Sequence, residues 1–353
     1  MDRSRTYIAT PPGATIKEQL EDRGMSQKEF AARMAMSEKH ISHLINGTVQ
    51  LTPDVANRLE MVLGIPASFW NNLEAIYREK LAKVEDENQM DADIELSKKY
   101  PYKVMVTNGW IDSAESKRDQ VILLRKYFEV SRLNLATADS VAPRIACRRQ
   151  SITEKADYAL LVWAQQAKLQ ARKQQVAKVN LQLLEERIPQ IRKLTRKDAE
   201  VFCPELIRLL AECGVAIVFL PHINGSFLHG ATFHDGNKIV VGLTVRGKDA
   251  DKFWFSLFHE LGHILLGHIN QPGGTTEEDE KAADDFAEEN LIHKQAFEQF
   301  VAMGDFSKCA IISFALRNEV DAGIVVGRLQ KKRCIQYSWH NDLKRKYEIA
   351  ANA

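Results

Sequence analysis

Apolar residues recur at helical spacing along most of this 353-residue chain. Residues 13–85 read as five short helices, expected at 14–23, from Ser26, at 38–45, from Thr52, and from Pro66 to about Val84. The clearest later helices are expected at 119–127, 153–179, 181–187, 204–213, 280–293, 294–301, 307–316 and 320–331, and one more runs from Phe255 until Gly267, which is placed to end it. Strands are expected only at 215–220, 227–233 and 238–245, the last two joined by a hairpin turn at 235–237. The pattern predicts a mostly helical α+β chain with one small β-sheet.

Capping residues give the early helices definite boundaries. Ser26 and Glu29 have the spacing of a capping box that opens the second helix, and Ser37 is placed to cap the third. These two short helices have the lengths and separation of a helix-turn-helix. Its core would be Phe30, Ala31, Met34, Ile41, Leu44 and Ile45. The same pattern also fits other small helical bundles, so spacing alone leaves both interpretations open.

An acidic and polar stretch from Val84 to Asp93 is the best candidate for a linker. We therefore expect an N-terminal all-α domain at 1–84, a linker and helical connecting region at 85–200, and a C-terminal domain with the sheet at 201–353. Within the connecting region, residues 164–178 are rich in Gln, Lys and Arg and read as an exposed helix.

The segment from Phe255 to His268 carries the clearest chemistry. It contains His259-Glu260-x-x-His263, and residues four apart on a helix lie one turn apart on the same face. Two imidazoles in that arrangement can bind one metal ion, and Glu260 can reach a metal-bound water and remove its proton. An apolar stripe at helical spacing supports a buried helix here, although three fixed positions also occur by chance in unrelated proteins.

A third metal ligand is available in the next predicted helix. Glu280 can complete a His₂Glu site with one position open for water, and Asp284, one turn further on, can hold the ring of a ligand histidine. The alternative is an acidic, solvated helix face, because Glu277, Glu278 and Asp279 are acidic as well. No role is assigned to the remaining histidines of this region, His222, His229, His234, His268 and His293.

With these residues the chain resembles the ImmA/IrrE family of metallopeptidases. The resemblance rests on His259-Glu-Leu-Gly-His263 and on Glu280-x-x-Ala-Asp284-x-Phe-Ala, and it covers roughly residues 200–335. It implies a zincin-like fold, a Zn²⁺ cofactor and Glu280 as the third ligand. Asp284 stands where the family more often has Asn, a change that keeps a hydrogen-bonding side chain.

The N-terminal segment resembles a second family. Residues 20–33 and 41–47 are similar to Xre/Cro-type DNA-binding domains, and residues 51–54 with 66–73 resemble the HigA antitoxin branch. This resemblance implies a homodimer whose third helix enters the major groove of a double-stranded DNA operator. Bases would be contacted from the start of that helix, and phosphates from helix N-termini. The candidate residues are Glu38, Lys39, His40 and His43 for bases, and Gln27 and Ser37 for phosphates.

Charge and composition limit the partners. Residues 1–100 carry 13 Lys and Arg against 16 Asp and Glu, a net charge of −3, so phosphate-driven affinity should be modest. Residues 101–200 have a net charge of +8, which is more simply a solvated helical surface than a second nucleic-acid site. The five cysteines are scattered, and no signal core or membrane-length apolar run is present. We expect a cytoplasmic protein with no membrane partner.

These features predict a DNA-binding transcriptional regulator fused to a zinc metalloendopeptidase that cleaves a repressor or antitoxin. The alternative is a non-proteolytic regulator or antitoxin whose zinc domain senses a signal or binds a partner such as a cognate toxin. The complete motif favours the enzyme, because a sensor would not need Glu260. We expect the substrate to add as a strand along residues 226–233, beneath a closing loop at Gly273-Gly274.

Overall fold

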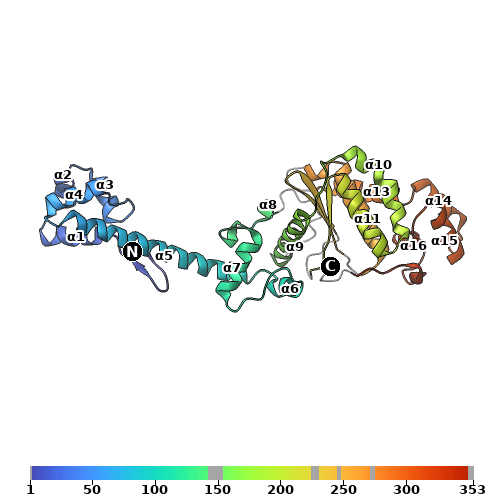
Figure 1. The fold of residues 1–353 in the computed structure, drawn as a ribbon, viewed down its shortest axis with the longest axis horizontal. Helices are drawn as coiled ribbons and strands as arrows, with labels where there is room; N and C mark the ends of the chain where they lie inside the picture. Colours follow the sequence, from blue (N-terminus) through green and yellow to red (C-terminus); the bar gives the residue numbers. More distant parts are fainter. Residues whose placement is uncertain (1, 142–153, 224–229, 245–247, 271–274, 349–353) are drawn as a thin grey trace. The chain divides into compact units, whose positions relative to one another are not determined.

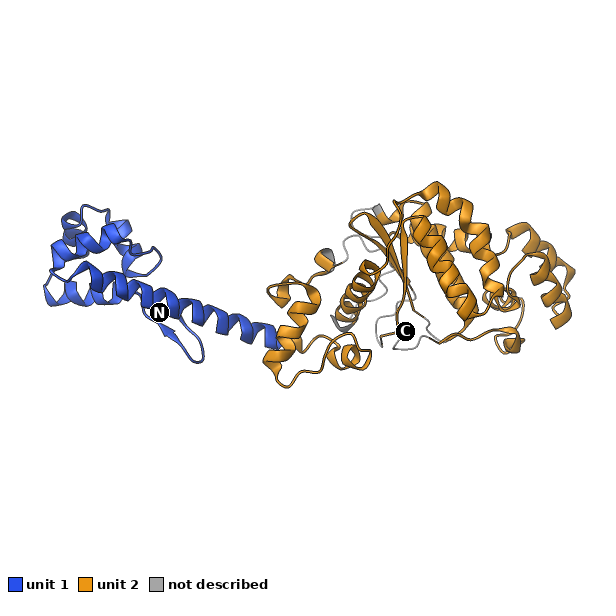
Figure 2. Cartoon of the chain, viewed as in Figure 1, with its two compact units in different colours: residues 1–95 blue, residues 96–353 orange. Residues whose placement is uncertain are grey.

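The computed structural model describes residues 2–141, 154–223, 230–244, 248–270 and 275–348 (Figure 1). Contacts divide the chain into two compact units, Met1–Glu95 and Leu96–Ala353 (Figure 2). The fold is mostly helical with a small mixed sheet in the second unit, which confirms the predicted class. No helix in the described ranges is long and apolar enough to cross a bilayer. The three-domain division, with boundaries at 84 and 200, stays a prediction.

Five helices build the first unit, and each begins at its predicted place. They are α1 (Gly13–Asp22), α2 (Gln27–Arg33), α3 (Glu38–Ile45), α4 (Pro53–Leu63) and α5 (Ala67–Ser97). Side-chain oxygens fix the starts of α3 and α4 by accepting from helix N–H groups: Ser37 accepts from His40 N at 3.2 Å, and Thr52 from Val55 N at 3.4 Å. The predicted helix-turn-helix core is buried, apart from the partly buried Ile45.

The capping box predicted at the start of α2 is only half formed. The hydroxyl of Ser26 accepts from the N–H of Glu29 at 3.2 Å. The Glu29 carboxylate instead accepts from Arg33, one turn later, at 2.6 Å. An ion pair between residues four apart on an exposed face thus replaces the second half of the box.

The helix α5 is longer than predicted, because it does not end near Val84 but continues through the acidic stretch to Ser97. The sequence did not reveal its partner, a short hairpin formed by β1 (Asp2–Arg3) and β2 (Ile8–Ala9). Tyr77 and Val84 of α5 are buried together with Ala9 of this hairpin.

Hydrogen bonds fix the hairpin to the acidic part of α5. Glu87 accepts from the Ser4 hydroxyl, and from Thr6 through its N–H at 3.0 Å and its hydroxyl at 2.6 Å. The side-chain amide of Asn88 donates to the Arg3 carbonyl at 3.2 Å. An acidic residue that suggested a linker is therefore a structural partner of the first residues of the chain.

The helices between the first unit and the sheet are α6 (Tyr102–Thr107), α7 (Lys117–Phe128), α8 (Ala138–Val141), α9 (Glu154–Arg172), α10 (Leu181–Lys193) and α11 (Ala199–Glu212). Short 3-10 turns lie at Leu133–Leu135 and Leu194–Arg196. The last of these helices begins earlier than predicted, with Pro204 inside it.

The predicted exposed helix at 164–178 is wrong in both its end and its exposure. The helix α9 ends at Arg172, and it packs against two strands of the sheet, with Gln165 only 1% exposed. Its glutamine is satisfied internally, because the side-chain amide of Gln165 donates to the Tyr127 carbonyl at 2.7 Å. The prediction took the polar side chains of this segment as a sign of exposure. A buried side-chain amide costs little free energy when it has a hydrogen-bond partner, so polar composition alone does not show that a helix is exposed.

The sheet has three strands in the order β3 (Val215–Phe219), β5 (Lys238–Leu243), β4 (Gly230–Asp235). The strands β3 and β5 are parallel, whereas β4 and β5 form an antiparallel hairpin in which Asp235 pairs with Lys238. Gly236 adopts φ +62° in the predicted turn, as a two-residue hairpin loop requires. The predicted start of β4 at 227–229 lies outside the described residues.

Helical structure returns after the sheet, close to the predicted places. The elements are α12 (Ala250–Leu265), α13 (Glu277–Leu291), α14 (Lys294–Met303), α15 (Lys308–Arg317) and α16 (Ala322–Lys331), with 3-10 turns at His268–Asn270 and Asn341–Leu343. Gly262 lets α12 and α13 approach closely, because a Cβ there would lie 3.2 Å from the Cα of Ala283. Gly267, at φ +79°, follows the end of α12 as predicted.

Candidate functional site

Three predicted ligand residues converge between α12 and α13. The Nε2 atoms of His259 and His263 lie 3.0 Å apart. The carboxylate of Glu280 lies 3.4 Å from the first of these nitrogens and 3.5 Å from the second. One ligand atom from each residue falls within 4.8 Å of the others, so the three side chains can hold one metal ion.

The electrostatics of this cluster favour a cation. Burial disfavours a charged His259, but hydrogen bonds to Asp284 and Glu280 outweigh it and raise the pKa of this ring to about 10. Burial lowers the pKa of His263 to about 4, so this ring is neutral and one of its nitrogens keeps a lone pair. A cluster that attracts positive charge and offers a neutral imidazole fits a divalent metal ion.

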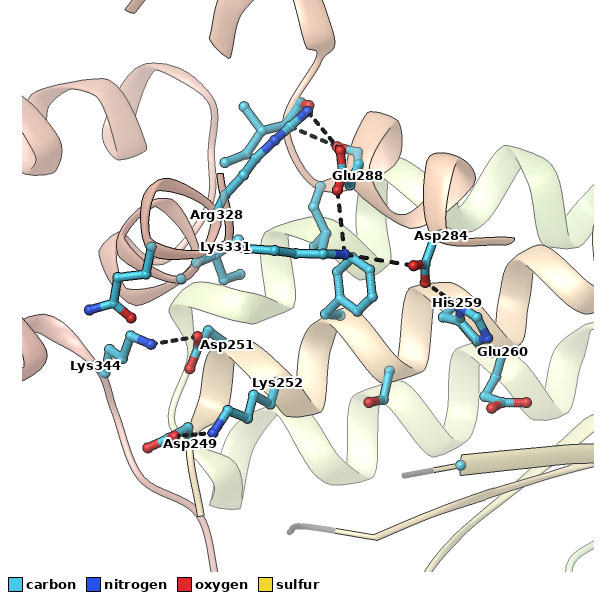
Figure 3. A pocket seen from close by; sticks show the side chains of 18 of the residues that line it. Asp249, Asp251, Lys252, His259, Glu260, Asp284, Glu288, Arg328, Lys331 and Lys344 are labelled. Atoms are coloured by element: carbon cyan, nitrogen blue, oxygen red, sulfur yellow. Dashed lines mark hydrogen bonds and ion pairs between the residues drawn. The ribbon is translucent and has the colours of Figure 1, made fainter. Parts of the chain in front are cut away.

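Asp284 lies where the sequence placed it, behind the first histidine. Its carboxylate is 2.9 Å from Nδ1 of His259, so it can accept from that nitrogen and leave Nε2 directed at the cluster. Lys331 of α16 approaches the same carboxylate at 3.7 Å and lies 4.2 Å from the centre of the Phe255 ring (Figure 3). The helix α16 thus contributes a side chain that contacts Asp284 on the side away from His259.

The second histidine contacts a residue that the sequence left unassigned. Nδ1 of His263 lies 2.9 Å from Nδ1 of His268, and Nε2 of His268 lies 3.4 Å from Asp279. His268 follows His263 by five residues, a spacing that a continuous helix does not bring face to face. The turn after α12 brings it back, and no local pattern predicts that contact.

Glu260 is held against the sheet. Its side chain is almost fully buried, and its Oε2 accepts from the hydroxyl of Thr232 on β4 at 2.5 Å. Gly230 makes room for it, because a Cβ at that position would lie 2.7 Å from Oε1. Burial raises the pKa of Glu260 to about 7, with His259 and Thr232 acting in the opposite direction. Sequence reasoning missed Thr232, which is 28 residues away.

The third predicted ligand also has a partner. The hydroxyl of Thr275 donates to Glu280 at 2.7 Å, immediately before α13 begins. Hydrogen bonds from His259 and Thr275 outweigh the effect of burial and lower the pKa of Glu280, so it is a carboxylate at neutral pH. The neighbouring acids are arranged differently: Glu277 and Glu278 are exposed.

A cleft of about 1100 Å³ opens beside the cluster. It extends along α12 from His259 and Glu260 towards Asp251, with α13 and α16 forming other walls (Figure 3). Its lining mixes apolar side chains such as Phe255 and Ile324 with many charged ones. Gly230 also lines the cleft, so the start of β4 borders the space next to the candidate metal centre.

The candidate DNA-contacting residues lie on α2 and α3 of the first unit. Gln27 is the first residue of α2, and Ser37 immediately precedes α3, where its hydroxyl already accepts from a helix N–H. Glu38 and Lys39 are exposed in the first turn of α3, as major-groove contacts require.

The two histidines of α3 are less available than the sequence suggested. His40 is half-buried, and its Nε2 is enclosed. His43 is exposed, but its Nδ1 lies 2.9 Å from the Thr48 hydroxyl. Three of the four candidate base-contacting residues, Glu38, Lys39 and His43, are thus exposed on α3.

Comparisons with known proteins match both parts of the chain. Residues 16–70 match the helix-turn-helix family, and residues 214–305 match a peptidase family described as the IrrE N-terminal-like domain. An uncharacterized HTH-type transcriptional regulator of Escherichia coli (strain K12), YddM, is 36% identical over 63 residues, which are 18% of this chain and 67% of that protein. The first match contains α2 and α3, and the second contains the sheet and the candidate metal cluster.

Proposed function

The chain belongs to the helix-turn-helix family of transcriptional regulators and carries an IrrE-like peptidase domain, and on that premise we propose that it is a DNA-binding regulator whose second unit is a zinc-dependent endopeptidase. The observation that carries the proposal is the position of Glu260. A buried carboxylate, fixed by Thr232, lies beside three converging metal-ligand side chains. Metal storage or a structural metal site has no need of such a group.

The ligands in this proposal are His259, His263 and Glu280, two imidazoles and one carboxylate, as in catalytic zinc sites with an open fourth position. Zinc in such a site supplies a Lewis acid and lowers the pKa of its water to about 7. Asp284 accepts from Nδ1 of His259, so this ring would offer the lone pair of Nε2 once it gives up its second proton to bind the metal.

Glu260 moves the proton. Its Oε2 is occupied by the Thr232 hydroxyl, which leaves Oε1 to take a proton from the attacking water. The same carboxyl then gives that proton to the nitrogen of the breaking peptide bond, so a carboxylate and an amine are formed. A pKa raised by burial to about 7 suits a group that must gain and lose a proton near neutral pH.

The first unit would bring this activity to an operator. We propose that α3 enters the major groove with Lys39 and Glu38 facing base edges, and that Gln27 and Ser37 contact phosphates. Residues 1–100 have a net charge of −3, so a single unit would bind phosphates weakly. A homodimer on a two-fold operator, as the HigA-like sequence implies, would double the contacts.

The substrate in this proposal is a repressor or antitoxin protein. The alternative is a regulator without proteolysis, whose zinc domain senses a signal or binds a partner such as a cognate toxin. Glu260 separates the two, because sensing needs the metal ligands but not the general base.

The test compares the parent protein with Glu260→Gln, using candidate repressors and antitoxins as substrates and intact-mass spectrometry as the readout. We expect the parent to cleave one of them at a single exposed segment, and Glu260→Gln to lose at least about 100-fold in rate while it keeps its zinc. Glu278→Gln, an exposed neighbour of the site, is the matched control. If Glu260→Gln regulates an operator-controlled reporter as the parent does, the non-proteolytic alternative is preferred.

A further inference from the structure

A second imidazole lies behind the buried histidine of the metal cluster. We propose that His268, together with Asp279, is a positioning residue that fixes the tautomer and orientation of His263. The inference rests on the proposed metal site and names residues that neither the motif nor the comparisons assign. It follows from the contacts from His263 Nδ1 to His268 Nδ1 at 2.9 Å and from His268 Nε2 to Asp279 at 3.4 Å.

If His263 binds the metal through Nε2, only one pair of tautomers fits the contacts from His263 to His268 and on to Asp279. Nε2 of His263 faces the other two ligands, and a ring nitrogen can bind a metal only through a free lone pair. The proton of His263 must therefore be on Nδ1. Since that nitrogen donates, Nδ1 of His268 must accept, and the proton of His268 must be on Nε2. That nitrogen faces the carboxylate of Asp279, which can only accept.

Because both rings are buried, His263 depends on His268 for its hydrogen bond. His263 is 0% exposed and His268 is 7% exposed, so water has little access to replace the contact between the rings. A buried N–H without an acceptor is unfavourable, and without His268 the ring of His263 could rotate or change tautomer. Either change would remove the Nε2 lone pair from the metal cluster.

The two ligand histidines are thus supported in different ways. His259 meets the carboxylate of Asp284 directly, and that side chain is 46% exposed and shared with Lys331. His263 contacts the neutral ring of His268, and that ring in turn contacts the carboxylate of Asp279. The intervening ring keeps a full negative charge away from the most buried ligand, where an unpaired charge would be most costly.

Asp279 is itself held in place by the start of α13. One of its oxygens accepts from the Thr276 N–H at 2.9 Å and from the Thr276 hydroxyl at 2.8 Å, which completes the capping box of this helix. The other oxygen faces His268. The helix cap and the orientation of a metal ligand therefore depend on the same carboxylate, and His268 is the cleaner target for a test.

The experiment measures the zinc affinity of the full chain by competition with a chelator, for the parent, His268→Leu and His268→Gln. A glutamine amide can both accept from His263 and donate towards Asp279, whereas leucine can do neither. We expect His268→Leu to bind zinc about 10- to 100-fold more weakly and His268→Gln to recover most of that loss. His293→Gln, at an exposed histidine, should bind zinc as the parent does. Cobalt-substituted protein should show a changed visible spectrum in His268→Leu only.

Equal zinc affinity in the parent and His268→Leu would overturn the proposal, as would equal losses in the leucine and glutamine variants. If His268→Leu does not fold, ring-nitrogen NMR on the zinc-loaded parent decides: Nδ1–H on His263 with Nε2–H on His268 supports the line, and Nδ1–H on His268 overturns it. A parent that binds no zinc would refute the metal site itself, which is a different failure.

Discussion

The hydroxyl of Thr232 lies 2.5 Å from Oε2 of Glu260, so the sheet holds the side chain that would move the proton. Thr232→Val keeps the shape and removes the donor. We expect kcat/KM to fall about 10-fold, the equivalent of about 1.4 kcal/mol for a hydrogen bond to a charged group, with zinc content unchanged. Thr232→Ser, which keeps the hydroxyl, is the control.

The same substitution has a predictable effect on the pH profile. The Thr232 hydrogen bond lowers the pKa of Glu260, so its loss should raise that pKa. A general base acts only when ionised, and the acid limb of kcat/KM should therefore move to higher pH in Thr232→Val. An acid limb at the same pH as in the parent would exclude Glu260 as the group that it reports.

Gly230 offers a steric test of the same side chain. A Cβ at this position would lie 2.7 Å from Oε1 and 2.9 Å from Cγ of Glu260, closer than such atoms can approach. Gly230→Ala should therefore displace Glu260 and lower cleavage by at least about 10-fold, while zinc stays bound. Ala231→Gly is the control on the same strand. Parental activity in Gly230→Ala would show that the base does not act from its observed position.

The ligand assignment predicts one zinc per chain. Glu280→Ala should lose most of its zinc, because it removes one of three protein ligands, whereas Glu278→Ala should retain it. Metal analysis after dialysis against a weak chelator measures both. Full zinc occupancy in Glu280→Ala would leave Asp284, on the same helix, as the next ligand to test.

The first unit makes a separate prediction about DNA. Lys39→Ala should cost about 1–3 kcal/mol on the specific operator if Lys39 reads a base, and Gln27→Ala should weaken all sequences alike. Lys17→Ala, an exposed lysine on α1, is the control. Fluorescence titrations with operator and scrambled DNA distinguish the three. If Lys39→Ala binds the operator as the parent does, α3 is not the recognition helix.

The register of the sheet shows which backbone groups of β4 face its outer edge. Ile239 N bonds Gly214 O and Leu243 O accepts from Leu220 N, so these residues of β5 direct their backbone groups towards β3. Their pairing partners on β4, among them Gly230, therefore direct backbone groups outward. Ala231, by contrast, directs its backbone groups towards β5. A proline substitution at Ala231 would therefore remove a hydrogen bond within the sheet, and it would not test substrate binding at the outer edge.

A substrate strand on that edge would depend on every second backbone group. Peptide substrates carrying one N-methyl group at successive positions should therefore lose cleavage with a period of two residues. Losses confined to the residues beside the cleaved bond would mean that the edge of β4 does not bind substrate.

The sequence predicted what local spacing determines. Side chains that cap their own helix fixed the starts of α3 and α4, and the four-residue spacing of His259 and His263 put both on one face of α12. Gly236 likewise located the hairpin of the sheet.

Contacts between distant residues could not be found in this way. Thr232 reaches Glu260 from another element, and Glu87 meets residues more than 80 positions earlier in the chain. His268 is near in sequence, yet its contact with His263 depends on the turn that ends α12. The exposure of Gln165 was wrongly predicted because its segment is rich in polar residues. In the folded chain its side-chain amide donates to the Tyr127 carbonyl, an acceptor that the sequence does not reveal.

The N-terminal hairpin limits how the first unit can be excised or transplanted. A fragment that stops at Val84 would lack Glu87 and Asn88, the residues that bind the loop and strand at the start of the chain. Residues 2–9 would lose the hydrogen bonds that hold them to α5, and the side chain of Tyr77 would lose part of its cover. Chimaeras that exchange DNA specificity between regulators of this type should therefore be joined after Glu95. The acidic stretch is part of the first compact unit, which carries the DNA-binding helices, and is not a linker to the second unit.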